Sequence, residues 1–159
     1  MYFTTFQSPM GEIAMTATDE GLTALAFQAG NAPISPQVNE QDNELVFADA
    51  KQQLTEYFAG KREVFTLKLA AKGTQFQQQV WQALTEIPFG ETVSYAWLAN
   101  KIGNDKAVRA VGSANGKNPI ALIVPCHRVI GANNKLTGYA GGLPLKAKLL
   151  RHEQADFIE

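Results

Sequence analysis

The chain has 159 residues, of which 45% are hydrophobic and 18% charged, a composition typical of a globular protein and not of a disordered one. This length accommodates one domain of ordinary size or two small ones. A single cysteine excludes an internal disulfide and a thiolate-rich zinc site, and two histidines leave few ligands for another metal. No apolar run approaches the ~18 residues of a membrane span, and no secretory signal precedes the first strand. We therefore expect a reduced, cytoplasmic setting without membrane contact.

Charge is distributed unevenly along the chain. Residues 1–70 carry four basic and nine acidic side chains, a net charge of −5, whereas residues 71–159 carry ten basic and six acidic ones, a net charge of +4. The asymmetry indicates an anionic partner for the second half, with ordinary scatter of surface charge as the alternative. Because the character of the sequence also changes near residue 70, we predict one domain over residues 1–70 and another over 71–159.

The first domain is predicted to be a small sheet with one helix. Three short apolar segments separated by turn sequences are typical of an antiparallel meander. They are residues 2–7, 12–17 and 22–27. Residues 28–43 lack a period and are expected to form a loop. A helix is predicted over residues 44–59, ended by Gly60, and alternation over residues 65–69 predicts one more strand.

The second domain is predicted to begin with a helix capped by Thr74. Two short helices follow, one over residues 94–102 that is capped by its first residue, and one over residues 106–115 that is capped by Asp105. Two helices joined by a short glycine-containing turn are typical of a helix-turn-helix DNA-binding unit, although a generic helical hairpin has the same pattern. A last helix is predicted from residue 143 to about residue 153.

The second of the two short helices is rich in small side chains and could therefore lie close to a DNA duplex. Arg109 is expected to face outward, because it lies on the side of the helix opposite Val111. The expected packing face consists of Ala107, Ala110, Val111 and Ala114. The small residues expected near the duplex are Ala107, Ala110, Gly112 and Ser113.

Residues 120–130 contain the only cysteine, Cys126, followed directly by His127. Apolar runs flank the pair, and Pro125 favours extended backbone before it, so we predict a buried strand-like segment that ends at the pair. A lone cysteine with a histidine nearby is a candidate nucleophile, because a base can remove the thiol proton. The alternative is a cysteine that acts only as a small buried hydrophobe.

Several motifs together resemble the O6-alkylguanine-DNA alkyltransferase family of DNA-repair proteins. The central motif is residues 125–129, and the match is tightest over residues 74–153. The flanking motifs, in family order and spacing, are residues 90–95, 109–112, 118–119, 138–142 and 152–153. The resemblance implies an α/β chain in which a small ribonuclease-H-like domain, an antiparallel sheet plus a helix, precedes a mainly helical winged helix-turn-helix domain that carries the cysteine.

The resemblance also implies roles for five residues of this chain. Cys126 would be the nucleophile, His127 would accept its proton through a water molecule, and Glu153 would orient and polarise His127. Tyr95 would assist protonation of the leaving base, and Asn118 would brace the turn before the active-site segment. The neighbouring His152 is expected at the surface.

On the DNA side, the resemblance implies a monomer that binds double-stranded DNA through the minor groove and flips the damaged base. Arg109 would fill the gap that the flipped base leaves. The residues implied to form the base pocket are Tyr139, Ala140, Val124, Val129 and Asn115. The substrate would be O6-alkylguanine, and also O4-alkylthymine, and no metal or cofactor is implied for this chain. Because nothing in the sequence would remove the thioether product, the protein should act once.

Two other classes of function remain open at this stage. A non-catalytic sensor would bind damaged DNA in the same pocket without accepting the alkyl group. A hydrolase with a Cys-His-Glu set would turn over many times and would show no salt-dependent affinity for DNA. The outward-facing Arg109 and the helix-turn-helix pattern argue against the hydrolase.

Overall fold

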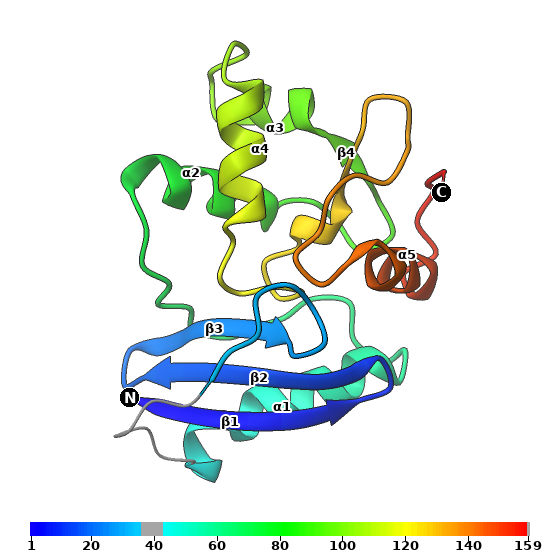
Figure 1. The fold of residues 1–159 in the computed structure, drawn as a ribbon. Helices are drawn as coiled ribbons and strands as arrows, with labels where there is room; N and C mark the ends of the chain where they lie inside the picture. Colours follow the sequence, from blue (N-terminus) through cyan, green and yellow to red (C-terminus); the bar gives the residue numbers. More distant parts are fainter. Residues whose placement is uncertain (36–42, 159) are drawn as a thin grey trace.

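The structure is a computed structural model that describes residues 1–35 and 43–158. A loop is predicted over residues 28–43, and residues 36–42 of it lie outside the described residues. Residues 28–35 of that loop contain no helix or strand. A sheet with one helix forms the first part, and helices dominate the second part (Figure 1). The first part comprises β1 (Tyr2–Ser8), β2 (Gly11–Thr18), β3 (Gly21–Phe27) and α1 (Glu44–Phe58). The second part comprises α2 (Gln75–Leu84), β4 (Val93–Ser94), α3 (Tyr95–Lys101), α4 (Val108–Gly116), the 3-10 turn η1 (Cys126–Arg128), β5 (Val129–Ile130) and α5 (Leu143–His152).

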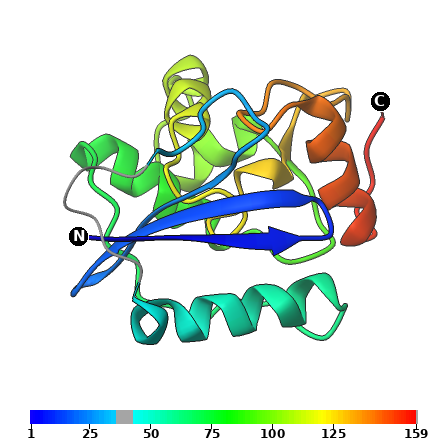
Figure 2. The same cartoon turned by 60° about the horizontal axis from the view of Figure 1, so that its bottom comes forward.

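The sheet is an antiparallel meander in the order β1-β2-β3, as the sequence predicts. Its middle strand is buried from Ile13 to Ala17, because α1 lies along one face of the sheet and the second part of the chain lies against the other (Figure 2). Asn43 caps α1 by accepting a hydrogen bond from the backbone N–H of Leu45 at 3.0 Å. Gly60, with a φ of +75°, follows the helix end as predicted.

The predicted strand over residues 65–69 is wrong. This segment makes one isolated bridge to the sheet, in which Leu69 pairs with Leu22. The side-chain amide of Gln53 in α1 accepts from the Thr66 N–H at 2.9 Å and donates to the Thr66 carbonyl at 3.3 Å. A buried amide therefore satisfies the backbone groups that a neighbouring strand would otherwise have satisfied.

The helices of the second part begin largely where the sequence predicts. Thr74 and Gln77 form a reciprocal capping box at the start of α2. The hydroxyl of Ser94 accepts from the Trp97 N–H at 3.0 Å and caps α3. The helix-turn-helix unit consists of α3 and α4, which pack on each other and on α2.

The predicted start of α4 is wrong. The helix begins at Val108 rather than at residue 106, and its N-cap residue, Ala107, makes no side-chain capping hydrogen bond. Asp105 instead accepts a hydrogen bond from the Asn100 side chain at 2.8 Å, which ties the turn to the end of α3. Ala110, predicted on the packing face, is exposed. Val111 and Ala114 are buried as predicted, Ala107 is partly exposed, and the third buried residue of the helix is Asn115.

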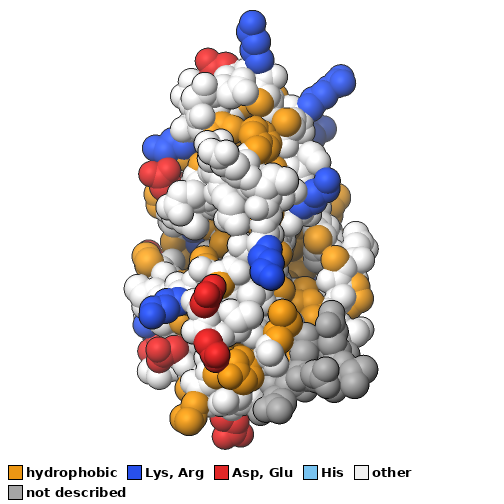
Figure 3. All heavy atoms as spheres, turned by 90° about the vertical axis from the view of Figure 1, so that its left-hand side faces the viewer, with side chains coloured by type: hydrophobic (Ala, Val, Ile, Leu, Met, Phe, Trp, Pro, Cys, Tyr) orange, Lys and Arg blue, Asp and Glu red, His pale blue; other side chains and the backbone are white. Residues whose placement is uncertain are grey.

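Lys and Arg side chains project from the upper half of the face seen in Figure 3, which belongs to the second part of the chain. The exposed basic residues of α3, α4 and the segments that flank α4 are Lys101, Lys106, Arg109 and Lys117. Four of the ten basic side chains of residues 71–159 are therefore displayed around the helix-turn-helix unit.

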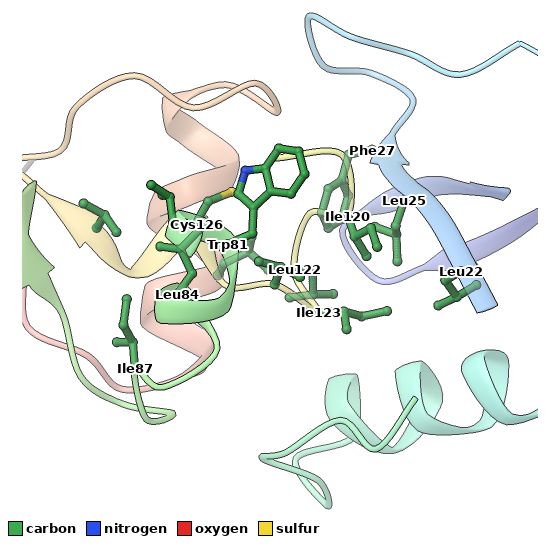
Figure 4. Close-up of a cluster of buried hydrophobic side chains, with 14 of the residues drawn as sticks. Leu22, Leu25, Phe27, Trp81, Leu84, Ile87, Ile120, Leu122, Ile123 and Cys126 are labelled. Carbon is green, nitrogen blue, oxygen red and sulfur yellow. The ribbon is translucent and has the colours of Figure 1, made fainter. Parts of the chain in front are cut away.

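The hydrophobic core is continuous between the two parts. Figure 4 shows it extending from Leu22 and Leu25 of β3, through Ile120, to Leu84 and Cys126. Backbone hydrogen bonds also cross between the parts, because the N–H of Leu25 donates to the carbonyl of Pro119 at 2.9 Å and the N–H of Ala121 donates to the carbonyl of Leu25 at 3.1 Å. The first part thus holds the segment that leads to the cysteine.

Candidate active site

The segment before Cys126 is a buried turn, so the predicted strand-like segment is wrong. The carbonyl of Ile120 accepts from the Val124 N–H at 3.0 Å, and Leu122 adopts a φ of +71° within this turn. The N–H of Cys126 then donates to the Val124 carbonyl at 2.8 Å across Pro125. Apolar residues in a buried turn and in a buried strand give the same sequence pattern, and hydropathy alone does not separate them.

Asn118 braces this turn from within. Its side-chain amide donates to the Val124 carbonyl at 2.8 Å and to the Ile120 carbonyl at 3.4 Å, and its side-chain oxygen accepts from the Ile120 N–H at 3.1 Å. A side-chain amide that satisfies three backbone groups can stabilise a buried irregular segment. Asn118 therefore ties together the turn that leads to Cys126.

Glu153, the residue that follows α5, is the centre of a buried polar cluster and is 1% exposed. Its Oε2 atom accepts from His127 Nε2 at 2.9 Å, from the Tyr57 hydroxyl at 2.5 Å and from the Arg128 guanidinium at 3.1 Å. Its Oε1 atom accepts from Arg128 Nε at 2.8 Å. Burial by itself would raise the pKa of Glu153, but the hydrogen bonds and charges of His127 and Arg128 outweigh it and hold the pKa well below its usual value.

The ionised Glu153 fixes the state of His127. A carboxylate only accepts hydrogen bonds, so the proton of the neutral imidazole lies on Nε2 and leaves Nδ1 as an acceptor. His127 is fully buried, and Nδ1 makes no hydrogen bond to any described residue. Burial lowers the pKa of His127, and the charge of Arg128 adds to this effect against the opposing contribution of Glu153. His127 is therefore a neutral base at physiological pH.

Cys126 is 7% exposed, at the start of η1. Burial raises the pKa of its thiol, whereas the Asn118 side chain and the positive charge of Lys146 act in the opposite direction. Thiolate formation at neutral pH therefore depends on groups close to the sulfur.

Lys146 is one such group, and the sequence did not indicate it. Its side chain is fully buried in α5, and Nζ donates to the carbonyls of Val129 at 2.6 Å and Thr137 at 3.1 Å. It makes no salt bridge with any carboxylate of residues 1–35 and 43–158. Burial lowers the pKa of Lys146 to about 8, and the charge of a Cys126 thiolate opposes that decrease. The ammonium therefore places an unneutralised positive charge in the neighbourhood of the thiol.

Tyr95 reaches this region through Thr137, and Tyr139 lies near Cys126. The Tyr95 hydroxyl shares a hydrogen bond of 2.6 Å with the hydroxyl of Thr137, and its ring lies under Gly112 of α4. The hydroxyl of Tyr139 is buried without a partner among the described residues. Burial raises the pKa of Tyr139, so this hydroxyl stays protonated and is able to donate a hydrogen bond.

The other residues predicted for a base pocket differ in burial. Val124, Val129 and Asn115 are buried, whereas Ala140 is exposed. Ala140 lines a cavity of about 300 Å³ that opens on the β3 side, and its carbonyl accepts from the N–H of Asn31 at 2.6 Å. The glycine-rich loop therefore contacts the first part of the chain.

The residues predicted to approach DNA lie along α4 and its start. Arg109, Ala110 and Ser113 are exposed, and Ala107 and Gly112 are partly exposed. Arg109 faces outward, as its position opposite the buried Val111 predicts. The outer side of α4 therefore presents small side chains beside one arginine, as the sequence predicts.

The sequence did not predict the position of four residues of the site. His152 was expected at the surface, but it is half-buried and its Nε2 bonds to the carbonyl of Tyr57 at 2.8 Å. Tyr57, Arg128 and Lys146 were not singled out at all. Arg128 follows the Cys-His pair and could have been noticed, because buried arginines need a carboxylate partner. Tyr57 gave no signal, because its partner lies 96 residues away.

The fold and the site together define a protein class: a helix-turn-helix unit followed in the chain by a buried thiol and a histidine–carboxylate pair. The model of the 6-O-methylguanine DNA methyltransferase ribonuclease-like domain matches residues 1–71, and that of the DNA binding domain of the same family matches residues 75–155. The chain therefore belongs to the 6-O-methylguanine DNA methyltransferase family, which confirms the predicted family and fold class.

Similar proteins span nearly the whole chain. A methylated-DNA--protein-cysteine methyltransferase of Methanosarcina acetivorans is 53% identical over 96% of this chain and 98% of its own length. The constitutive protein of that name from Bacillus subtilis is 47% identical over 99% of this chain and 98% of its own length. The structure of Mycobacterium tuberculosis OGT in complex with DNA has a TM-score of 0.89 and 45% identity, and the match covers 97% of this chain and 93% of that one. Within the described part of the chain, no helix is long and apolar enough to cross a membrane.

Proposed function

We propose that this protein repairs DNA by transferring the alkyl group of O6-alkylguanine, and of O4-alkylthymine, to Cys126. The observation that carries the proposal is the buried hydrogen bond between His127 and Glu153. His127 directly follows Cys126, which bears the only thiol of the chain. The relatives named methylated-DNA--protein-cysteine methyltransferase support the same reaction at high identity.

In the proposed reaction, His127 accepts the thiol proton at Nδ1 through a water molecule, and Glu153 stabilises the imidazolium that forms. The sulfur attacks the alkyl carbon in line with the bond to O6. The carbon–sulfur bond forms as the carbon–oxygen bond breaks, and the electron pair stays on the guanine oxygen. Tyr95 donates a hydrogen bond or a proton to the leaving base, and the positive charge of Lys146 favours the thiolate.

The proposed partner is double-stranded DNA, bound by one copy of the protein through the minor groove. The small exposed side chains of α4 allow close approach to the duplex, and the exposed Arg109 would occupy the space of the flipped base. Flipping is required because the thiol is buried and cannot reach a stacked base. A cytoplasmic, reducing setting suits a single unprotected thiol.

The thioether product is stable, and the proposed site contains no group that would hydrolyse it. Each molecule should therefore react once. Incubation with a duplex containing O6-methylguanine should add one methylene mass to the intact protein, map to Cys126 and saturate at one equivalent. The Cys126→Ser protein should bind the duplex but gain no mass.

Two other results would identify the competing functions. Tight binding of the wild-type protein without a mass change would indicate a sensor. Repeated turnover of an ester substrate without salt-dependent DNA binding would indicate a hydrolase. Either result would contradict the proposed function.

A further inference from the structure

One residue of the first part of the chain holds the end of α5 at two points. The hydroxyl of Tyr57 in α1 donates to Glu153 Oε2 at 2.5 Å, and its backbone carbonyl accepts from His152 Nε2 at 2.8 Å. The rings of Tyr57 and His152 lie 4.8 Å apart between centroids. The Tyr57 side chain is fully buried, and Phe65 and Phe89 pack against its ring at 5.4 and 6.1 Å. Two consecutive residues of the active-site end of α5 therefore depend on one residue of α1.

The Glu153 atom that Tyr57 contacts is the same atom that contacts the proposed base. Oε2 accepts from both Tyr57 and His127, whereas Oε1 is held by Arg128 alone. Arg128 Nη2 reaches Oε2 only at 3.1 Å, the longest of these contacts. Two contacts therefore set the position of Oε2 relative to the His127 ring: the hydrogen bond of Arg128 to Oε1 and the short hydrogen bond of Tyr57 to Oε2.

We propose that Tyr57 is a positioning residue for alkyl transfer to the Cys126 thiol, acting through Glu153 on His127. The inference rests on the proposed function, since it assigns Tyr57 a part in activating the same thiol. Its consequence is that the first domain does more than support the second: it supplies one of the hydrogen bonds that set the geometry of the base. No direct contact between Tyr57 and the DNA or the sulfur is needed.

Tyr57, Glu153 and His127 form a hydrogen-bonded relay toward Cys126. The other charged and titratable groups around this relay are unchanged in the Tyr57→Phe variant. Around Glu153 they are His127 and Arg128 from η1 and His152 from α5. Around Cys126 they are Lys146 from α5 and Tyr139 from the glycine-rich loop. These groups set the absolute reactivity of the thiol, so only a comparison between variants isolates Tyr57.

The test compares Tyr57→Phe with Tyr2→Phe, which removes a tyrosine hydroxyl from an exposed hydrogen bond with Asp19 in the same domain. Because Cys126 is the only cysteine, its alkylation by iodoacetamide can be followed by intact mass as a function of pH. Tyr57→Phe should raise the apparent pKa of the thiol and slow the reaction at pH 7 by roughly 3- to 10-fold, the effect of one net hydrogen bond. Tyr2→Phe should change neither. An unaltered pH profile for Tyr57→Phe would overturn the proposal.

A double-mutant cycle separates positioning from a general structural effect. If Tyr57 acts through Glu153, Tyr57→Phe should cause no further decrease in the rate of Cys126 alkylation in a Glu153→Gln background, where the carboxylate is already absent. Additive losses would show that Tyr57 acts by another route and would contradict the proposal.

A measurement on the wild-type protein covers the case in which Tyr57→Phe fails to fold. Tyrosine labelled with ¹³C at Cζ reports hydroxyl hydrogen bonding by NMR. Alkylation of Cys126 should shift the Tyr57 signal and leave the Tyr2 signal in place, and an unmoved Tyr57 signal would overturn the relay. Iodoacetamide requires no DNA, so a protein that shows the relay but ignores O6-methylguanine duplexes would contradict the proposed function and not this inference.

Discussion

At the scale of single residues, Lys146 is the least expected feature of the site. Long charged side chains are rarely buried without a partner of opposite charge. The ammonium bonds to two backbone carbonyls, of Val129 and Thr137, and the thiol of Cys126 is the ionisable group whose negative charge it stabilises. The buried positive charge of Lys146 therefore stabilises the thiolate form of Cys126.

Lys146→Met should raise the apparent pKa of the Cys126 thiol, since a positive charge near the thiolate is lost, and slow alkylation at pH 7 by roughly tenfold. Iodoacetamide alkylation across pH measures both quantities. Lys148→Met is the matched control, because Lys148 lies exposed on the same helix. Equal behaviour of the two variants would remove Lys146 from the group that activates the thiol.

At the scale of elements, the helix-turn-helix unit shows which helix ends can be predicted from neighbouring residues and which cannot. Ser94 caps α3 as predicted, because a cap is a contact between residues three apart. The cap predicted at Asp105 failed, since that carboxylate pairs with the Asn100 side chain at the end of the preceding helix. The strand-like segment predicted before Cys126 is wrong for a similar reason: the conformation of this segment depends on hydrogen bonds from the side-chain amide of Asn118.

The exposed Arg109 on α4 gives a prediction at this scale. Arg109→Ala should slow repair of O6-methylguanine in duplex DNA, because the gap left by the flipped base is no longer filled. Reaction with free O6-benzylguanine should change little, since no base has to be flipped. Single-turnover rates on the two substrates provide the comparison, with Lys61→Ala as a control for loss of an exposed positive charge in the first part of the chain. Equal losses on both substrates would refute the role of Arg109 in flipping.

At the scale of the whole molecule, the buried Lys146 makes stability depend on pH. Its pKa is about 8 in the folded protein and ~10.4 in an unfolded chain. Between these values the unfolded chain holds a proton that the folded chain has released, so this residue makes the folded state more stable as the pH rises. Below pH 8 both states hold the proton, and the folded protein bears the full cost of burying the charge.

We expect this effect to be measurable by urea unfolding between pH 7 and 10.5 in a Cys126→Ser background, where the thiol does not titrate. The free energy of unfolding of the Cys126→Ser protein should rise relative to that of the Cys126→Ser, Lys146→Met protein by up to about 3 kcal/mol. A difference that stays constant with pH would mean that Lys146 keeps its ordinary pKa in the folded state.

The sequence by itself determined the three-stranded meander, the order of the helices, most helix ends and the pair of residues proposed to carry the chemistry. Cys126 and His127 are adjacent in the chain, and capping contacts such as that of Thr74 join residues a few positions apart. Signals of this kind depend on local geometry and period, which are present before the chain folds. Family motifs then assigned Glu153 to His127, although the two lie 26 residues apart.

Only the tertiary structure decided what surrounds the thiol. The partners of Tyr57, the burial of Lys146 and the inward position of His152 depend on how α5 packs against η1 and α1. The physical reason is that these contacts join distant residues and stabilise polar groups that a local reading assigns to the surface. Burial removes water as a partner, so each of these groups takes its hydrogen bond from whichever element packs beside it.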